Sequence, residues 1–244
     1  MRMLVFAERN RKELLRDPLS LIFSIGLPLV LLFIMTAIRN STGADIFRME
    51  DFGPATAVFG QTFIAMFTGL LVAQDRGSAY LTRLFASPMT AKDFILGYSL
   101  PLIPLSLVQG AICLAASAAL GLPASVNLIW TLICLLPSAL LFIALGLLLG
   151  CLLRETQVGG VASILIQVAA FTSGMWFDVK LVGGAFLSIS RLLPFYHAVE
   201  AVRGALRGDI GGVFLSVLDV CAWAAVLMVA AVCVFRTNMK CDKN

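Results

Sequence analysis

Six apolar runs of roughly twenty residues each constrain this chain more than any other feature of its sequence. A helix of that length crosses the ~30 Å hydrocarbon core of a bilayer and satisfies its backbone hydrogen bonds within itself. The runs cover residues 19–38, 55–73, 96–120, 126–151, 158–177 and 213–235. They lack the period-two alternation of barrel strands. The sequence therefore predicts an all-α, polytopic membrane protein with six transmembrane helices in a single membrane domain, residues 1–244.

The composition agrees with this prediction, because the chain is too apolar for a soluble domain. Of its 244 residues, 60% are hydrophobic and 13% are charged, whereas soluble domains have about half and about a quarter. Its six cysteines show no CxxC spacing, so we expect small hydrophobic residues there rather than metal or redox ligands. The surplus of apolar surface requires a bilayer as its solvent.

The distribution of lysine and arginine predicts the orientation. Six spans place both termini on one side of the membrane. That side carries 12 Lys and Arg residues and the opposite side carries 6. Because positive residues accumulate in cytoplasmic segments, we expect a multi-pass protein of the cell membrane with both termini in the cytoplasm.

The segment before the first span predicts a helix lying in the membrane interface. Met3, Leu4, Ala7 and Leu14 can share one face of a helix within residues 1–18, with charged residues elsewhere. Such a pattern is typical of amphipathic interfacial helices. An ordinary solvated basic tail is the alternative.

The connection between the fifth and sixth spans, residues 178–212, is rich in glycine and too weakly apolar to cross the bilayer. It predicts two short helices broken at Pro194. We expect a re-entrant pair on the extracellular side, which persists only when it packs against protein.

Signals for an enzyme are missing. The chain has no G-x-x-x-x-G-K-[ST] phosphate loop, and Gly146 with Gly150 forms a helix-packing G-x-x-x-G pattern instead. The single histidine, His197, cannot build a zinc site with its neighbours. Residues 171–174 read FTSG and lack the first glycine of a G-x-S-G protease motif. We therefore expect no catalytic residue and no metal site.

Polar residues within the spans are candidates for a translocation path. They are Gln61, Thr62, Gln109, Gln167, Thr172, Ser173 and Asp219. The uncharged members fit equally a role as hydrogen bonds between helices. Asp219 has three possible roles: a solvated acid near the outer interface, a partner for Arg203 or Arg207, or a polar point in a pathway.

The loop after the second span carries a family resemblance. Residues 75–90 read DRGSAYLTRLFASPMT, with an acidic–Arg pair, a Leu-x-Arg-Leu run and a closing Ser-Pro. They resemble the cytoplasmic coupling segment of the ABC transporter type-2 (exporter) permeases. Gly77 and Ala79 depart from the family's common Glu and Gly. The resemblance assigns ATPase coupling to Asp75, Arg76, Tyr80, Leu81, Arg83, Leu84, Phe85, Ser87 and Pro88.

Two further stretches resemble the same family in the same order: residues 16–19 (RDPL) before the first span and residues 193–204 (LPFYHAVEAVRG) before the last. The resemblance implies a permease subunit, not itself an enzyme, of an ATP-driven exporter. Its expected partners are a separate ABC ATPase, which would hold ATP and Mg, a second permease subunit, identical or different, and membrane lipid, with no nucleic acid. We expect an amphiphilic, drug-like or lipid-like substrate.

The residues of the coupling segment, 75–93, support a docking role on their own. An apolar face with a basic rim suggests a protein partner, although a helix lying flat on lipid would show the same pattern. The alternatives to an exporter subunit are an ATP-independent secondary transporter or channel, which would transport without ATP, and a membrane scaffold, which would not transport.

Overall fold

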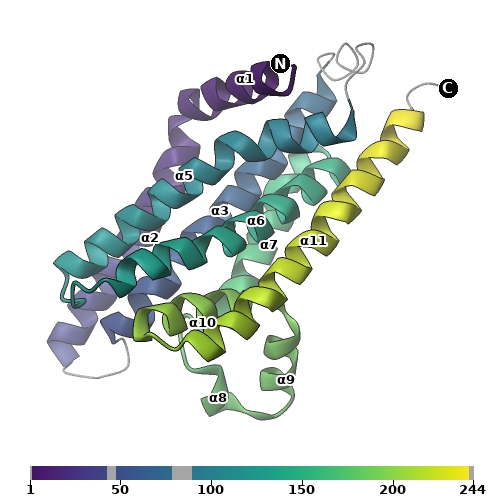
Figure 1. Cartoon of the computed structure of the whole chain (residues 1–244). Helices are drawn as coiled ribbons and strands as arrows, with labels where there is room; N and C mark the ends of the chain where they lie inside the picture. Colours follow the sequence, from purple (N-terminus) through teal and green to yellow (C-terminus); the bar gives the residue numbers. More distant parts are fainter. Residues whose placement is uncertain (1, 43–47, 79–89, 242–244) are drawn as a thin grey trace.

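The computed structural model describes residues 2–42, 48–78 and 90–241 (Figure 1). Within these ranges the chain forms helices and no strand, which confirms the predicted all-α class. The helices are α1 (Arg2–Arg16), α2 (Pro18–Thr42), α3 (Met49–Gly77), α5 (Ala91–Ala119), α6 (Asn127–Leu152), α7 (Glu155–Thr172), α8 (Val179–Val182), α9 (Gly184–Leu192), α10 (Pro194–Arg207) and α11 (Ile210–Cys241).

Five of the described helices are long and apolar enough to cross a membrane, namely α2, α3, α5, α6 and α11. The predicted count of six is not confirmed, because α7 has only 18 residues and begins with the polar sequence Glu-Thr-Gln. Nevertheless α7 runs the length of the bundle. Glu155 at its start accepts a hydrogen bond from Gln74 near the end of α3, and Gly174 just beyond its end contacts Arg203 of α10.

Helix α3 forms the centre of the bundle. In its most apolar window 83% of residues are buried within the chain, compared with 22% for α2 and 17% for α11. The outer helices expose large apolar side chains such as Phe33 and Phe214. Bilayer lipid is the natural solvent for such surfaces, so α2 and α11 carry much of the membrane-facing surface.

The close approach of α6 to α3 depends on two glycines. A Cβ atom at Gly146 would lie 2.3 Å from the backbone oxygen of Ala65, and one at Gly150 would lie 2.6 Å from the Cβ of Val72. Residues without side chains let two helix backbones approach closely in a membrane. The predicted packing role of this G-x-x-x-G pattern is therefore confirmed.

The connection between α7 and α11 is helical and breaks at Pro194 as predicted, but it contains three helices instead of the expected two. Gly183 and Gly184, both at positive φ, separate α8 from α9. Helix α9 ends at Leu192, and α10 begins at Pro194, a residue favoured at the first helical position because it has no N–H to leave unpaired. Gly208, in the left-handed conformation with φ 77°, ends α10. Whether these helices dip into the bilayer stays a prediction.

The charged residues gather at two opposite ends of the bundle. Figure 1 shows α1 and the last turns of α11 at one end, and α8, α9 and α10 at the other. We call these the α1 end and the α10 end. Helix α3 connects them, since Asp51 and Asp75 are separated by about 36 Å at 1.5 Å per residue.

Candidate functional site: the base of the coupling segment

Asp75, the first residue of the resemblance, is buried rather than presented to a partner. Its exposed fraction is 4%. Both carboxylate oxygens accept hydrogen bonds from Arg9 of α1, at 2.6 Å for Nη1 and 2.8 Å for Nη2. The Tyr98 hydroxyl of α5 donates to the same carboxylate. Asp75 therefore joins three helices at the point where residues 79–89 begin.

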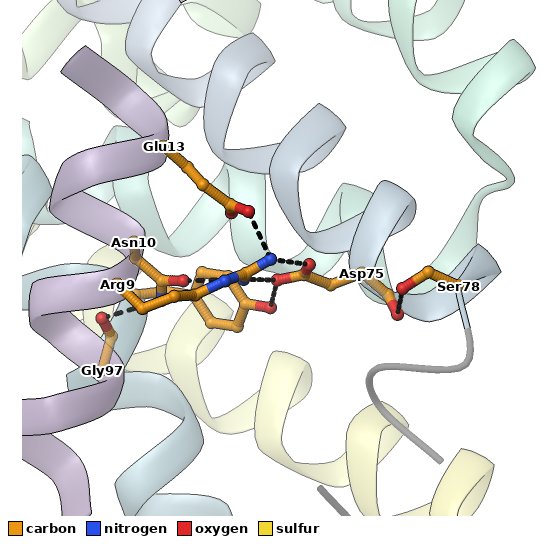
Figure 2. Close-up of polar contacts among 7 residues, drawn as sticks. Arg9, Asn10, Glu13, Asp75, Ser78 and Gly97 are labelled. Atoms are coloured by element: carbon orange, nitrogen blue, oxygen red, sulfur yellow. Dashed lines mark hydrogen bonds and ion pairs between the residues drawn. The ribbon is translucent and has the colours of Figure 1, made fainter. Parts of the chain in front are cut away.

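Arg9 is the centre of this network, which we call the Arg9–Asp75 cluster: Arg9, Asn10, Glu13, Asp75 and Tyr98. Figure 2 shows the guanidinium of Arg9 between the carboxylates of Glu13 and Asp75. Burial raises the pKa of the Glu13 carboxyl above its ordinary value, and the nearby Arg9 opposes this rise. Two carboxylates around one guanidinium leave the cluster with a net negative charge when Glu13 is ionised.

Apolar and amide contacts fix α1 against α5 beside this cluster. Asn10 is fully buried and donates from Nδ2 to the backbone oxygen of Gly97 at 3.1 Å. The rings of Phe6 and Tyr98 meet edge to face, with centroids 4.9 Å apart. These contacts orient the Tyr98 hydroxyl toward Asp75.

The predicted amphipathic α1 is confirmed as a helix, but its inward face differs from the expected one. Phe6, Asn10 and Leu14 are buried at i, i+4 and i+8, together with Ala7. Leu4, which we expected on the same face as Ala7, is 61% exposed. Phe6, Asn10 and Leu14 form the contact face, because residues four positions apart lie on one side of a helix.

Arg76, the second residue of the resemblance, also points into the chain. Its Nη1 donates to the backbone oxygen of Gly150 at 2.7 Å and contacts that of Cys151. These carbonyls belong to the last turn of α6, where backbone acceptors lack helical partners and the helix dipole favours a cation. Asp75 and Arg76 thus attach the end of α3 to α1, α5 and α6.

The other residues that the resemblance assigns to coupling, Tyr80, Leu81, Arg83, Leu84, Phe85, Ser87 and Pro88, lie outside the described residues. The structure resumes at Thr90, which caps α5. The Thr90 side chain accepts from the backbone N–H of Asp93, and the Asp93 carboxylate accepts from that of Thr90. A defined helix therefore begins directly after the segment.

Two of the candidate path residues hold helices together at the centre of the bundle. Gln61 is fully buried, donates to the backbone oxygen of Leu135 at 3.0 Å and accepts from Ser138 at 2.6 Å. Gln109, also fully buried, donates to the backbone oxygen of Ala57 at 3.4 Å. Its Oε1 is buried without a hydrogen-bond partner. These contacts favour the packing interpretation for both residues.

Of the remaining uncharged candidates, Thr62 and Ser173 line one small and mostly apolar pocket, which Gln167 and Thr172 do not line. Thr62, Thr172 and Ser173 each donate to a backbone oxygen three or four residues earlier. Gln167 is exposed on α7. The described residues therefore contain no continuous polar line through the bundle that joins these side chains.

Asp219 has a different partner from those considered. Its carboxylate lies 3.6 Å from Nδ1 of His197 and is 52% exposed. The suggested pairing with Arg203 or Arg207 is wrong, because Arg207 instead binds the Asp51 carboxylate and Arg203 donates to the backbone oxygens of Asp51 and Gly174. Asp219 sits only ten positions into α11, at the α10 end, where its half-exposed carboxylate faces His197 of α10.

The α1 end also contains a cavity of about 370 Å³ between α1 and α3. Apolar residues of α3 form one wall and charged residues at the end of α1 form the rim. The lining residues are Glu13, Leu14, Arg16, Asp17, Phe67, Leu70, Leu71 and Gln74. Such a cavity suits a molecule with both apolar and polar parts.

Among the described residues, no three His, Cys, Asp or Glu side chains group around a point where a metal ion could bind.

Comparison with known proteins identifies the family. The sequence model of the ABC-2 type transporter family matches residues 2–206, which extend from α1 to the end of α10. The chain belongs to the ABC-2 type transporter family. A relative in Bacillus subtilis (strain 168), named "Putative transport permease YvfS", is 22% identical over 201 residues, covering 79% of this chain and 82% of that protein. The present ABC-2 protein is therefore a multi-pass membrane transport permease.

Sequence reasoning missed Arg9, Asn10 and Tyr98, although they complete the site. Arg9 looked like one of several cations in a basic segment, and Tyr98 like one more apolar residue of a span. A signal was present for Asn10, because an amide between Phe6 and Leu14 at fourfold spacing interrupts an otherwise apolar face.

Proposed function

We propose that this ABC-2 permease is the membrane subunit of an ATP-driven exporter and that residues 75–90 receive the motion of a separate ATPase. The observation that carries the proposal is the attachment of Asp75 and Arg76 to three other helices. A segment that pushes on the end of α3 at this point acts on α1, α5 and α6 together. Rigid attachment is required if a small movement outside the membrane is to move a helix bundle.

The partners follow from this mechanism. ATP and Mg bind to the ATPase chain, because the permease sequence contains no phosphate loop. Two permeases, identical or different, pair above two ATPases, with bilayer lipid around them. The α1 end faces the cytoplasm, in accord with the excess of lysine and arginine on that side, and the α10 end faces outward across the cell membrane.

The cavity at the α1 end supports an amphiphilic substrate, drug-like or lipid-like. Its apolar wall includes Phe67, Leu70 and Leu71, and its rim includes Arg16 and Glu13. A molecule entering from the inner leaflet would place its tail against α3 and its polar group against the end of α1. Burial of the tail there provides affinity in proportion to the apolar area covered.

The test is reconstitution of the permease with its phosphate-loop ATPase in proteoliposomes. Efflux of an amphiphilic dye should require ATP hydrolysis. The double variant Leu84→Asp with Arg83→Glu places two negative charges on the coupling segment and should abolish ATPase association and efflux. Arg236→Glu is the matched control, because Arg236 is an exposed cation at the same end of the bundle but outside the segment.

Three results would contradict the proposal. Efflux without ATP would indicate a secondary transporter or channel. Unchanged ATPase association in the double variant would remove the docking role of residues 75–90. Equal loss in Arg236→Glu would show that general charge at this end, rather than the segment, controls association.

A further inference from the structure

The α10 end contains a polar cavity of about 150 Å³ that the coupling mechanism does not use. It lies between the first turn of α3, the turn after α7 and one face of α10. Its charged lining consists of four cations, Arg48, Lys180, Arg203 and Arg207, and three carboxylates, Asp51, Asp178 and Glu200. The walls therefore carry one more positive than negative group.

The three carboxylates already have contacts within the chain. Asp51 accepts from Arg207. Asp178 accepts from the backbone N–H of Lys180 at 2.9 Å and thereby caps α8. Glu200 lies 3.7 Å from Nη1 of Arg203. Among the described residues, Asp51 and Glu200 each have one ion pair, and Asp178 has the backbone hydrogen bond alone.

The cations are less well satisfied. The side chains of Arg48 and Lys180 make no hydrogen bond or ion pair with another described residue, and both residues are exposed at the cavity. Together with Arg203 and Arg207 they give the lining its excess of positive charge. A concave site with low-dielectric walls strengthens the field of such charges and concentrates anions.

Arg203 is the fixed element of the site. Its side chain is 12% exposed. Nε donates to the backbone oxygen of Asp51 at 2.9 Å and Nη2 to that of Gly174 at 3.0 Å, so the guanidinium plane is held by two elements. Nη1 remains beyond hydrogen-bond distance of Glu200 and retains N–H groups for a ligand.

We propose that this cavity binds one oxyanion group, a phosphate or a carboxylate, between Arg203 and the two exposed cations Arg48 and Lys180. The cavity is large enough for such a group, and its mainly charged lining does not suit a lipid tail. Guanidinium groups bind oxyanions through paired N–H donors. The ligand is either a free anion or the headgroup of an anionic lipid whose chains stay in the surrounding bilayer.

Trp176 also lines the cavity and serves as the reporter. The full-length permease with Trp130→Phe and Trp223→Phe retains Trp176 as its sole tryptophan. In nanodiscs of phosphatidylcholine it is titrated with inorganic phosphate at constant ionic strength. In a second arm, phosphatidylglycerol replaces a rising fraction of the lipid. We expect a saturable change in Trp176 emission in at least one arm.

Charge-neutralising variants make the test specific. Arg48→Gln and Lys180→Gln should each weaken the binding by about tenfold, the effect of removing one charge-assisted contact. Arg191→Gln is the matched control, because Arg191 is an exposed cation of α9 that does not line the cavity. All three positions are exposed, so circular dichroism and gel filtration should show an unchanged fold.

The outcomes separate the sources of the anion. Saturation with inorganic phosphate indicates a free oxyanion, and saturation only with phosphatidylglycerol indicates a lipid headgroup. Absence of saturation in both arms overturns the proposal, as does an equal weakening in Arg191→Gln. None of these results depends on an ATPase, so the proposal stands or falls separately from the exporter function.

Discussion

The Arg9–Asp75 ion pair should account for most of the attachment of α1 to the end of α3. Removing one partner of a buried pair costs about 3–5 kcal/mol, and exposed pairs contribute at most about 1 kcal/mol. The Arg9 side chain is 29% exposed and that of Asp75 is 5% exposed, so the pair lies between these limits. We expect a coupling free energy of about 2 kcal/mol, or about thirtyfold in the equilibrium.

A double-mutant cycle measures this coupling. Arg9→Ala, Asp75→Ala and the double variant are unfolded in mixed micelles by a graded denaturing detergent, and the free energies of unfolding are compared. The Glu8–Arg11 pair of α1 is the matched control. It is also an ion pair, at 2.7 Å, but both side chains are largely solvent-exposed, so solvent screening should leave little coupling.

The bidentate geometry gives a second expectation within the same experiment. Arg9→Lys keeps the charge but replaces two parallel hydrogen bonds with one, so it should recover only part of the stability lost in Arg9→Ala. A coupling for Arg9 and Asp75 no larger than that for Glu8 and Arg11 would refute the reasoning. Full recovery by lysine would show that charge alone, without geometry, stabilises the contact.

Three further predictions concern packing and protonation. Gly146→Ala should lower the free energy of unfolding by about 1–3 kcal/mol, because the added Cβ meets the Ala65 backbone. Gly159→Ala, which meets nothing within 4 Å, should not destabilise the protein. Gln61→Leu should lower the thermal stability but leave transport per folded molecule unchanged, since Gln61 binds neighbouring helices. The free energy of unfolding of the wild type should fall as pH rises just above the ordinary glutamate pKa. Glu13→Gln should remove this fall.

The sign of the Glu13 effect follows from its raised pKa. The folded state holds the proton more tightly than the unfolded state, so the stabilisation is complete below the unfolded pKa and is lost as pH rises through the folded pKa. A wild-type protein whose free energy of unfolding increases over this pH range would contradict a raised Glu13 pKa. For Gln61→Leu, loss of transport without loss of thermal stability would support a path role instead. Equal destabilisation by the two alanine variants would show that close helix contact at Gly146 is unimportant.

The sequence predicted where the candidate site lies, at residues 75 and 76, but not all of the side chains that form it. Residues 75 and 76 stood out because residues 75–90 resemble the coupling segment of a known permease family. The roles of their side chains could not be derived, since an isolated Asp-Arg pair at a span end fits a docking surface as well as an internal anchor. The partner of Asp219 was likewise not readable, because Arg203, Arg207 and His197 all precede it within one connection.

The sequence by itself determined that this chain is a helical membrane protein, where most of its long helices lie and where the chain breaks at Pro194. These properties are local, since the length and hydropathy of a run and the chemistry of proline act within a few residues. Only the tertiary structure decided that Arg9 meets Asp75, 66 residues away, and that Asp51 meets Arg207, 156 residues away. Such pairs depend on the rotation and tilt of each helix against its neighbours, which the packing of the whole bundle sets.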